Sequence, residues 1–276
     1  MICYEFVLSI LDCRNSYLYT SDGPGPGGRM LNPFVAKLKH SFVLSEADEA
    51  ALSRASEHVR VVSPRTNLIS EGDAPDHVHL IQRGFACRYK VLPSGSRSIV
   101  AFLIPGDFCD LNVSILGAMD HCIGTITSCD VVRIPRSVMD DLLGNHRTLE
   151  RALRWAGLVD EAILREWLVN MGRRSADQQI AHLFCELLLR LQAVGLATEN
   201  SYVFPLTQAD LGDTAGLSNV HVNRVVQGLR QKKLVVFRER RVTLPDVEAI
   251  KDFAGFNPNY LHLRPRPLPH PAGRRN

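Results

Sequence analysis

The sequence predicts an α+β protein with an N-terminal antiparallel β-roll of the jelly-roll kind, a long helix, and a small C-terminal domain of helices and one hairpin. Three observations predict this fold class. Short strand-like segments alternate with evenly spaced turns in the first half of the chain. One long apolar stripe at helical spacing follows. Two helix caps then flank a tight turn, ahead of a basic hairpin.

The composition excludes several classes of protein. The chain has 276 residues, 45% of them hydrophobic and 22% charged, and no run approaches the roughly 18 apolar residues of a membrane-spanning helix. The seven cysteines are dispersed and never in CxxC spacing, which argues against a zinc ribbon and a secreted disulfide scaffold. We therefore expect a cytoplasmic protein with mostly buried thiols and no membrane association.

The charge is unevenly distributed along the chain. The net charge is only +3, but residues 201–245 hold seven Lys and Arg against three acids, and residues 262–276 hold four Arg and no acid. The rest of the chain is therefore net acidic. This distribution suggests that the C-terminal part contacts a polyanion.

The two ends of the chain differ in composition from the rest. Residues 23–28 match G-x-G-x-x-G by letter, but two prolines remove amide donors that a phosphate-binding loop would use. We expect residues 1–29 to be a disordered leader or a wrongly assigned start, and we favour Met30 as the initiator. Residues 257–276 end in a basic, Pro-rich segment and are expected to form a disordered tail.

Glycine turns divide residues 30–145 into short strands. Gly72, Gly84, Gly95 and Gly106 recur at intervals of 12, 11 and 11 residues, each beside a typical turn residue. This even spacing predicts an antiparallel β-roll rather than a βαβ fold. The expected strands are 78–82, 86–92, 98–104, 124–127 and 131–134, and the expected helix 45–57 begins with a capping box of Ser45 and Asp48.

A long helix is predicted over residues 146–172, because apolar residues recur there at steps of three and four between charged ones. A stripe on so long a helix is typical of pairing with a second copy of the chain. The alternative is a helix that packs its stripe on its own β-roll. Residues 172–175 break the pattern and are expected to form a hinge. The predicted dimerisation residues are Leu149, Leu153, Ala156, Val159, Ile163 and Trp167.

Residues 173–256 are predicted to form a winged helix-turn-helix domain. Thr207 and Asp210 form a capping box at the start of its first short helix. Gly216 permits a turn with positive φ, and Ser218 caps the next helix. The preceding helix and strand are expected at 176–194 and 202–206, and the buried face of the second helix is Val222, Val225, Val226 and Leu229.

The second helix of this motif has no acidic residue from 219 to 229. Asn side chains can bond adenine, and Arg side chains guanine, with two hydrogen bonds each in the major groove. A hairpin with strands 234–237 and 242–244 follows, and its basic loop 238–241 suits phosphate contact. The predicted DNA-binding residues are Thr207, Ser218, Asn219, Val220, His221, Asn223, Arg224, Gln227, Arg238 and Arg240.

The chain resembles the Crp–Fnr family of bacterial transcription regulators over about residues 40–245. The turns Glu71-Gly72-Asp73, Arg83-Gly84 and Pro105-Gly106-Asp107-Phe108 carry the resemblance, together with the helix-turn-helix. It implies a cyclic-nucleotide-binding-like β-roll, a homodimer joined by the long helix, and a palindromic operator in double-stranded DNA, with RNA polymerase as a candidate partner. It also implies that Asn219, Val220 and Arg224 read the operator.

The signal sensed by the β-roll is left open by the sequence. Leu111 stands where cyclic-nucleotide-binding members of the family have a ribose-binding Glu. No Arg lies between Arg97 and Arg133 to hold the cyclic phosphate, and Asp120 would repel it. The resemblance therefore implies the fold without the cyclic AMP site, and a cyclic-nucleotide-responsive activator is the alternative.

Haem or redox sensing and catalysis are weaker alternatives. A haem would need an axial ligand in the β-roll, and a redox switch would need two cysteines on neighbouring strands, whereas core or surface roles are commoner for such residues. An enzyme with an attached DNA-binding module would need a catalytic motif, and no P-loop, GxSxG or HExxH is present. We expect no enzyme activity, no cofactor and no metal. The candidate haem ligands are His77, His79 and Cys87, and the candidate redox pair is Cys122 and Cys129.

Overall fold

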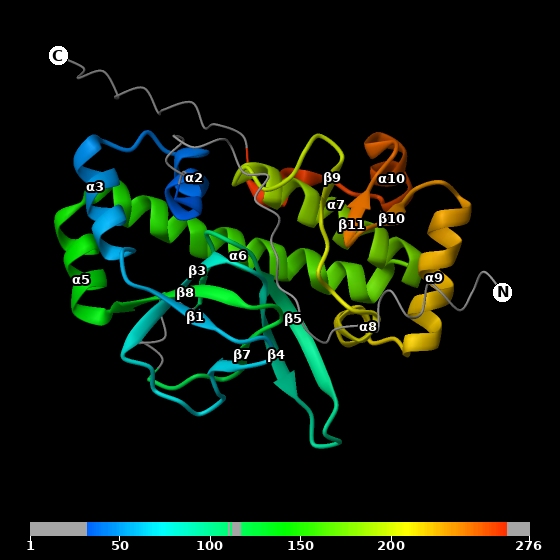
Figure 1. Ribbon diagram of the computed structural model, residues 1–276, viewed down its shortest axis with the longest axis horizontal. Coiled ribbons are helices and arrows are strands. Elements are labelled where there is room, and N and C mark those ends of the chain that lie inside the picture. Colours follow the sequence, from blue (N-terminus) through cyan, green and yellow to red (C-terminus); the bar gives the residue numbers. More distant parts are fainter. Residues whose placement is uncertain (1–31, 110, 112–116, 264–276) are drawn as a thin grey trace, which may run out of the picture.

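The computed structural model describes residues 32–109, 111 and 117–263. The fold has the predicted α+β architecture, with a β-roll, a long helix and a helix-turn-helix domain that carries a small sheet. Figure 1 shows the long helix α6 (Arg147–Arg173) running along the molecule beside the β-roll, toward the helix-turn-helix domain. The predictions made for residues 1–29, Met30 and residues 264–276 lie outside the described residues.

The β-roll consists of two four-stranded antiparallel sheets. One has the strand order β1-β8-β3-β6 and the other β2-β7-β4-β5. The predicted strands correspond to β3, β4, β5, β7 and β8, whereas β1, β2 and β6 were not predicted. The bounds are β1 (Val59–Val62), β2 (Asn67–Ile69), β3 (His77–Arg83), β4 (Ala86–Val91), β5 (Arg97–Leu103), β6 (Phe108–Cys109), β7 (Cys122–Thr125) and β8 (Cys129–Pro135).

The turn glycines have a backbone conformation that other residues rarely adopt. The φ angles of Gly72, Gly84, Gly95 and Gly106 are 89°, 90°, 81° and 92°. A Cβ on Gly84 would lie 2.3 Å from the carbonyl oxygen of Ser128, so this position also lacks the room for a side chain. The regularly spaced glycines of the sequence therefore mark a series of turns that each contain a residue with positive φ.

Helices cover the outer face of the first sheet. Side chains of β3 and β8, such as Leu80 and Val132, are buried against Phe34 of α2 and Leu52 of α3. The capping box predicted at Ser45 is present, because the Ser45 hydroxyl accepts from the Asp48 amide and the Asp48 carboxylate accepts from the Ser45 amide. The helices are α2 (Pro33–Lys39), α3 (Glu46–Ala55) and α5 (Arg136–Asn145).

The long helix buries its predicted stripe within its own subunit. Leu149 and Leu153 pack among residues of α2 and α3, while Ile163 and Trp167 pack against β5 and the next helix, α7 (Ala176–Ala193). The six residues predicted to contact a second subunit are at most 6% exposed, so that assignment is corrected in favour of the alternative, packing on the chain's own core. Periodicity identified the buried face but could not say which surface covers it. The six residues are Leu149, Leu153, Ala156, Val159, Ile163 and Trp167.

The helix-turn-helix domain follows a break at residues 174–175, close to the predicted hinge. Its sheet has the strand order β10-β11-β9. A disordered tail was expected from residue 257, but the chain stays folded beyond that point. Tyr260 and Leu261 are buried, and the Tyr260 hydroxyl donates to Glu186 over 3.0 Å. No helix among the described residues is long and apolar enough to span a membrane. The elements are β9 (Ser201–Val203), α8 (Gln208–Ala215), α9 (Asn219–Gln231), β10 (Val236–Arg238), β11 (Arg241–Thr243), α10 (Val247–Ala254) and η1 (Pro258–Leu261).

Candidate nucleic-acid interface

Local capping and close packing fix the angle between α8 and α9. The Thr207 hydroxyl donates to the Asp210 carboxylate over 2.7 Å and accepts from the Asp210 amide over 3.2 Å. Gly216 ends α8 with a φ of 66°, and a Cβ on Gly212 would lie 2.6 Å from the carbonyl oxygen of Leu217. The two helices therefore approach at a point where only glycine fits.

Helix α9 has one buried and one outward face. The predicted core residues Val222, Val225, Val226 and Leu229 are all buried, at most 7% exposed. The Ser218 hydroxyl accepts from the His221 amide over 3.3 Å and so caps the helix as predicted. Exposed residues at its start and first turns are Ser218, Asn219, Val220 and Arg224, and half-buried ones are His221, Asn223 and Gln227.

The exposed Val220 and Arg224 are thus available to a ligand outside the domain, and Val220 is 82% exposed. Thr207 is different, because its hydroxyl is engaged in the capping box of α8. The hydroxyl of Thr207 therefore positions the start of α8. The contact of Thr207 with DNA that the sequence suggested stays a prediction.

The hairpin of β10 and β11 forms the predicted wing, with a shorter loop than expected. Only Glu239 and Arg240 connect the strands, and their φ angles are 47° and 61°. Two left-handed residues match the twist of a tight hairpin. Arg238 and Arg240 are exposed, whereas Arg241 donates to the Ser201 hydroxyl of β9 over 3.1 Å.

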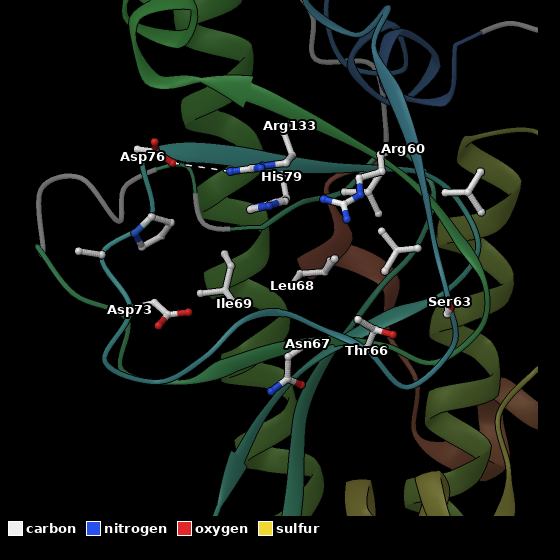
Figure 2. A pocket seen from close by; sticks show the side chains of 15 residues that line it. Arg60, Ser63, Thr66, Asn67, Leu68, Ile69, Asp73, Asp76, His79 and Arg133 are labelled. Atoms are coloured by element: carbon white, nitrogen blue, oxygen red, sulfur yellow. Dashed lines mark ion pairs between the residues drawn. The ribbon is translucent and has the colours of Figure 1, made fainter.

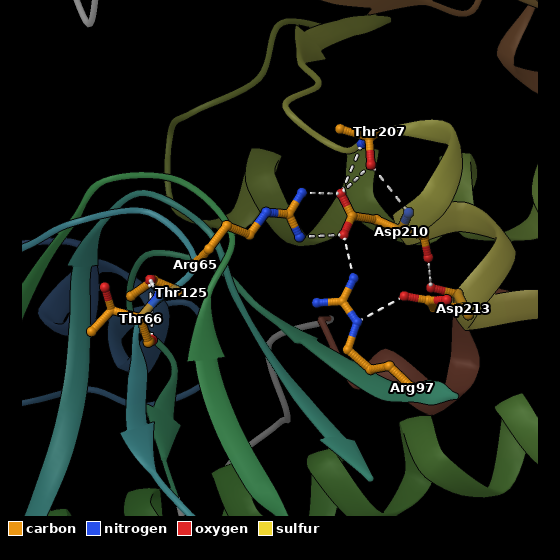
Figure 3. A network of polar contacts seen from close by, with 8 residues as sticks. Arg65, Thr66, Arg97, Thr125, Thr207, Asp210 and Asp213 are labelled. Atoms are coloured by element: carbon orange, nitrogen blue, oxygen red, sulfur yellow. Dashed lines mark hydrogen bonds and ion pairs between the residues drawn. The ribbon is translucent and has the colours of Figure 1, made fainter. Parts of the chain in front are cut away.

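Two arginines of the β-roll hold α8, a contact that was not predicted. Arg65, in the turn between β1 and β2, donates from both terminal nitrogens to the two carboxylate oxygens of Asp210 over 2.6 and 2.9 Å. Arg97 of β5 donates to Asp210 over 2.8 Å and to Asp213 over 2.7 Å. Figure 3 shows the two guanidinium groups converging on α8. We call Arg65, Arg97, Asp210 and Asp213 the arginine clasp.

The charge on Asp210 depends on this clasp. Burial by itself raises the pKa of Asp210, but hydrogen bonds from Arg65 and Thr207 outweigh it and lower the pKa to about 2. The carboxylate is fully buried and ionised at neutral pH, so removing its partners would leave a buried charge uncompensated.

A second ionic contact ties α7 to the β-roll. Arg190 is 9% exposed and donates to Asp107 over 2.7 Å, to the Phe102 carbonyl over 2.9 Å and to Glu186 over 3.0 Å. Asp107 belongs to the Pro-Gly-Asp-Phe turn and also accepts from Lys37 over 2.6 Å. The helix-turn-helix domain is therefore held to the β-roll by salt bridges at both α7 and α8.

Residues 119–121, which belong to the segment compared with a cyclic-phosphate site, contact other side chains of the chain. Met119 is 4% exposed in the interior of the roll, and the exposed Asp120 contacts His121 at 2.7 Å. Arg88 of β4, which was not among the predicted site residues, lies between the roll and α6. It donates to Asp160 of α6 over 3.1 Å and to the Phe108 carbonyl over 3.0 Å. Its positive charge is therefore already partnered by a carboxylate.

The residues considered for redox or haem sensing do not come together. Cys122 lies on β7 and Cys129 on β8, in different sheets, so the neighbouring strands that a redox switch would need are not present at this pair. Burial raises the pKa of the Cys87 thiol to about 12 and that of Cys129 to about 11. Protonated, buried thiols of this kind are poor nucleophiles and metal ligands. Within the described ranges, no group of three or more His, Cys, Asp or Glu side chains could hold a metal ion.

Both halves of the chain match models of known domain families. Residues 59–146 match the cyclic nucleotide-binding domain, and residues 178–253 match the Crp-like helix-turn-helix domain. The nitrogen fixation regulation protein FixK of Bradyrhizobium diazoefficiens is 28% identical over 221 residues, which cover 79% of this chain and 91% of FixK. The transcriptional activatory protein AadR of Rhodopseudomonas palustris is 28% identical over 197 residues, 70% of this chain and 79% of AadR.

The fold is shared with solved structures. FixK2 from Bradyrhizobium japonicum aligns with a TM-score of 0.62 and 21% identity, over 71% of this chain and 96% of FixK2. The two domains, their order along the chain and the geometry of the helix-turn-helix agree with one family. The chain belongs to the Crp–Fnr family of DNA-binding transcription regulators.

Proposed function

We propose that two copies of the chain bind a palindromic operator in double-stranded DNA. Each copy would place α9 in a major groove and Arg238 and Arg240 of its wing on the adjacent backbone. The observation that carries this proposal is the outward face of α9, where Asn219, Val220 and Arg224 are exposed and no acid is present. Such a face offers bidentate donors to bases and no charge that phosphate would repel.

The proposed dimer contact is an apolar face of α6 that the subunit leaves open. Leu164, Leu168 and Met171 follow one another at helical spacing and are 48%, 65% and 55% exposed. Gly157 lies on the same side, and a Cβ there would meet no atom within 4 Å. A partner helix can therefore approach closely at this point. This face takes the place of the buried stripe that the sequence suggested.

The proposed control of DNA binding passes through the arginine clasp. Helix α8 supports α9 through the close contact of Gly212 with Leu217, so a shift of α8 re-aims the recognition helix. Arg65 and Arg97 fix α8 from the β-roll. A signal that moves either arginine would therefore change the position of α9 relative to its counterpart in the dimer.

The same proposal covers location and partners. A regulator of this kind acts where bacterial DNA lies, in the cytoplasm, and needs no catalytic activity. RNA polymerase is the proposed second partner, because relatives such as AadR are named transcriptional activators.

Selection of duplexes from a random pool by the full chain tests this function. We expect enrichment of an inverted repeat by the natural protein and by an Arg54→Ala control, since Arg54 is exposed on α3, far along the chain from the helix-turn-helix. An Arg224→Ala variant is expected to lose preference at one base pair of each half-site. Failure of the natural protein to enrich any sequence would contradict the proposal.

A further inference from the structure

A cleft opens between the two sheets of the β-roll on the side of β1 and β2. Its volume is about 610 Å³, and its walls come from β1, β2, β3 and β8 and the connections near them. Both β1 and β2 are edge strands of their sheets, opposite the edge where β5 and β6 lie. The cleft is therefore separate from Arg88 and α6, and its size is in the range of small-molecule sites.

One wall of the cleft carries a buried histidine with an unused hydrogen-bonding atom. His79 of β3 is 7% exposed, and its Nδ1 has no hydrogen-bond partner. Burial lowers the pKa of His79 to about 4, with Arg133 adding to the effect, so the ring is neutral at pH 7. An unpaired polar atom in such a position costs free energy unless something in the cleft supplies the missing bond.

The cleft also contains a cation without a counter-ion. Arg60 of β1 is an exposed residue at the rim of the cleft and makes no ion pair with any residue in the described part of the chain, and Figure 2 shows its guanidinium group turned toward His79. The other charges that line the cleft have partners. Arg133 lies 3.8 Å from Asp76, which also contacts His77, and the Asp73 carboxylate accepts from the Ser70 amide over 2.8 Å.

The remaining wall is apolar. Leu68 and Ile69 of β2 and Val131 of β8 line the cleft beside these polar groups, and Ile69 and Val131 are almost fully buried. A ligand that satisfies the whole cleft therefore combines a negative charge for Arg60, a hydrogen-bonding group for His79 and an apolar body.

We propose that this cleft binds a small organic carboxylate with an apolar body, with the carboxylate on Arg60 and the body against Leu68, Ile69 and Val131. The proposal deepens the proposed function, on which it rests, by naming the class of effector.

The cleft shares a turn with the arginine clasp. Ser63 and Thr66, in the turn between β1 and β2, line the cleft, and Arg65 between them pairs with Asp210 of α8. Arg65 has a φ of 57°, an uncommon conformation for a residue with a side chain, which the surrounding contacts must hold. A ligand that contacts Thr66 and binds one position of this turn more tightly than another would therefore shift α8, and with it the direction of α9.

The probe for the test is phenylacetate, and phenylacetamide is its uncharged counterpart. Saturation-transfer NMR and calorimetry on the full chain without DNA are expected to show binding of phenylacetate at millimolar concentration. An Arg60→Gln variant and the amide are each expected to weaken binding by about tenfold or more, because a charge-assisted hydrogen bond is lost. Arg54→Gln, which removes an exposed arginine from α3, is expected to leave binding unchanged.

Equal binding of the acid and the amide, equal effects of the Arg60 and Arg54 variants, or no binding at all would overturn the site. A second measurement tests the coupling: phenylacetate is expected to change the operator affinity of the natural protein but not of Arg60→Gln. An unchanged affinity in the natural protein would overturn the coupling. Because the binding measurement contains no DNA, failure of the proposed DNA function would appear separately, as absence of operator binding by the natural protein.

Discussion

Arg224 and Arg240 are both exposed cations, but they lie on different elements of the helix-turn-helix domain. Arg224 lies on the outward face of α9 and Arg240 in the tight turn of the wing. If Arg224 contacts a guanine with two hydrogen bonds, Arg224→Ala should cost about 1–3 kcal/mol at the operator and relax preference at one base pair. Arg240→Ala should weaken binding to all DNA sequences alike. It should also reduce the slope of log affinity against log salt concentration by about one.

Titration of both variants against operator and scrambled duplexes at several salt concentrations separates these roles. Arg54→Ala on α3 serves as a control for the loss of one positive charge. Equal weakening of both duplexes by Arg224→Ala would show that this residue contacts phosphate instead of a base.

The clasp predicts how stability responds to acid. The pKa of Asp210 is about 2 in the folded chain against an ordinary value of 3.8, so the folded state favours the ionised form. Its contribution to the free energy of unfolding is therefore full above about pH 4 and is lost as the pH falls toward about 2. Arg65→Gln should remove part of this acid-sensitive stability and cost about 1–3 kcal/mol at neutral pH.

Urea denaturation at neutral and acid pH measures both effects. Arg83→Gln is the matched control, because Arg83 pairs with Asp130 over 3.0 Å in an exposed setting, where an ion pair contributes about 1 kcal/mol or less. If the Arg65 and Arg83 variants lose the same stability, with the same dependence on pH, the buried clasp does not stabilise the fold as described.

At the scale of elements, α6 has two apolar faces with different roles. Leu168→Glu places a charge on the open face and should yield folded monomers in sedimentation experiments, because burying an unpaired carboxylate at an interface is costly. Ile163→Ala creates a cavity inside the subunit and should cost about 2–5 kcal/mol of stability. It should leave the folded fraction dimeric. A dimeric Leu168→Glu variant with unchanged affinity would place the subunit contact elsewhere.

Local signals explain which elements the sequence revealed. Strands β3, β4 and β5 follow glycine turns and were found, whereas β1 has one half-buried and three exposed residues and shows no alternation. For α6 the apolar period identified Ile163 and Trp167 as buried, but part of the covering surface comes from β5, which is distant along the chain, and the rest from the next helix, α7. The apolar periodicity of a helix indicates which of its faces is buried, but not which surface covers that face.

At the scale of the whole molecule, the parts of the candidate site that depend on neighbouring residues could be predicted from the sequence, and the parts that depend on distant residues could not. The caps at Thr207 and Ser218 act over three residues, so the helix-turn-helix could be found from its own sequence. The clasp could not, because Arg65 lies 145 residues from Asp210 and Arg97 lies 113 residues from it. The capping box with Thr207 was enough to explain an Asp at position 210, so its pairing with Arg65 and Arg97 was not predicted.

The packing of the β-roll predicts that cyclic AMP binds the protein weakly or not at all. Arg88 is the arginine placed between the roll and α6, and Asp160 and the Phe108 carbonyl already accept from it. Met119 is packed in the interior, so a cyclic phosphate would have to displace core contacts and a salt bridge. Calorimetry should therefore show no binding at micromolar cyclic AMP. Binding in that range would restore the cyclic-nucleotide-responsive activator as the better description.

The spacing of operator half-sites tests the central claim, a dimer that reads DNA with two copies of α9. Half-sites should lie one helical turn apart, about 34–36 Å, and the selected operator should bind two chains. Inserting about five base pairs at its centre turns one half-site to the opposite side of the duplex. We predict that fluorescence anisotropy will then show a fall in affinity to about the level of a single half-site. Unchanged affinity for the lengthened operator, or one chain bound per operator, would contradict the account.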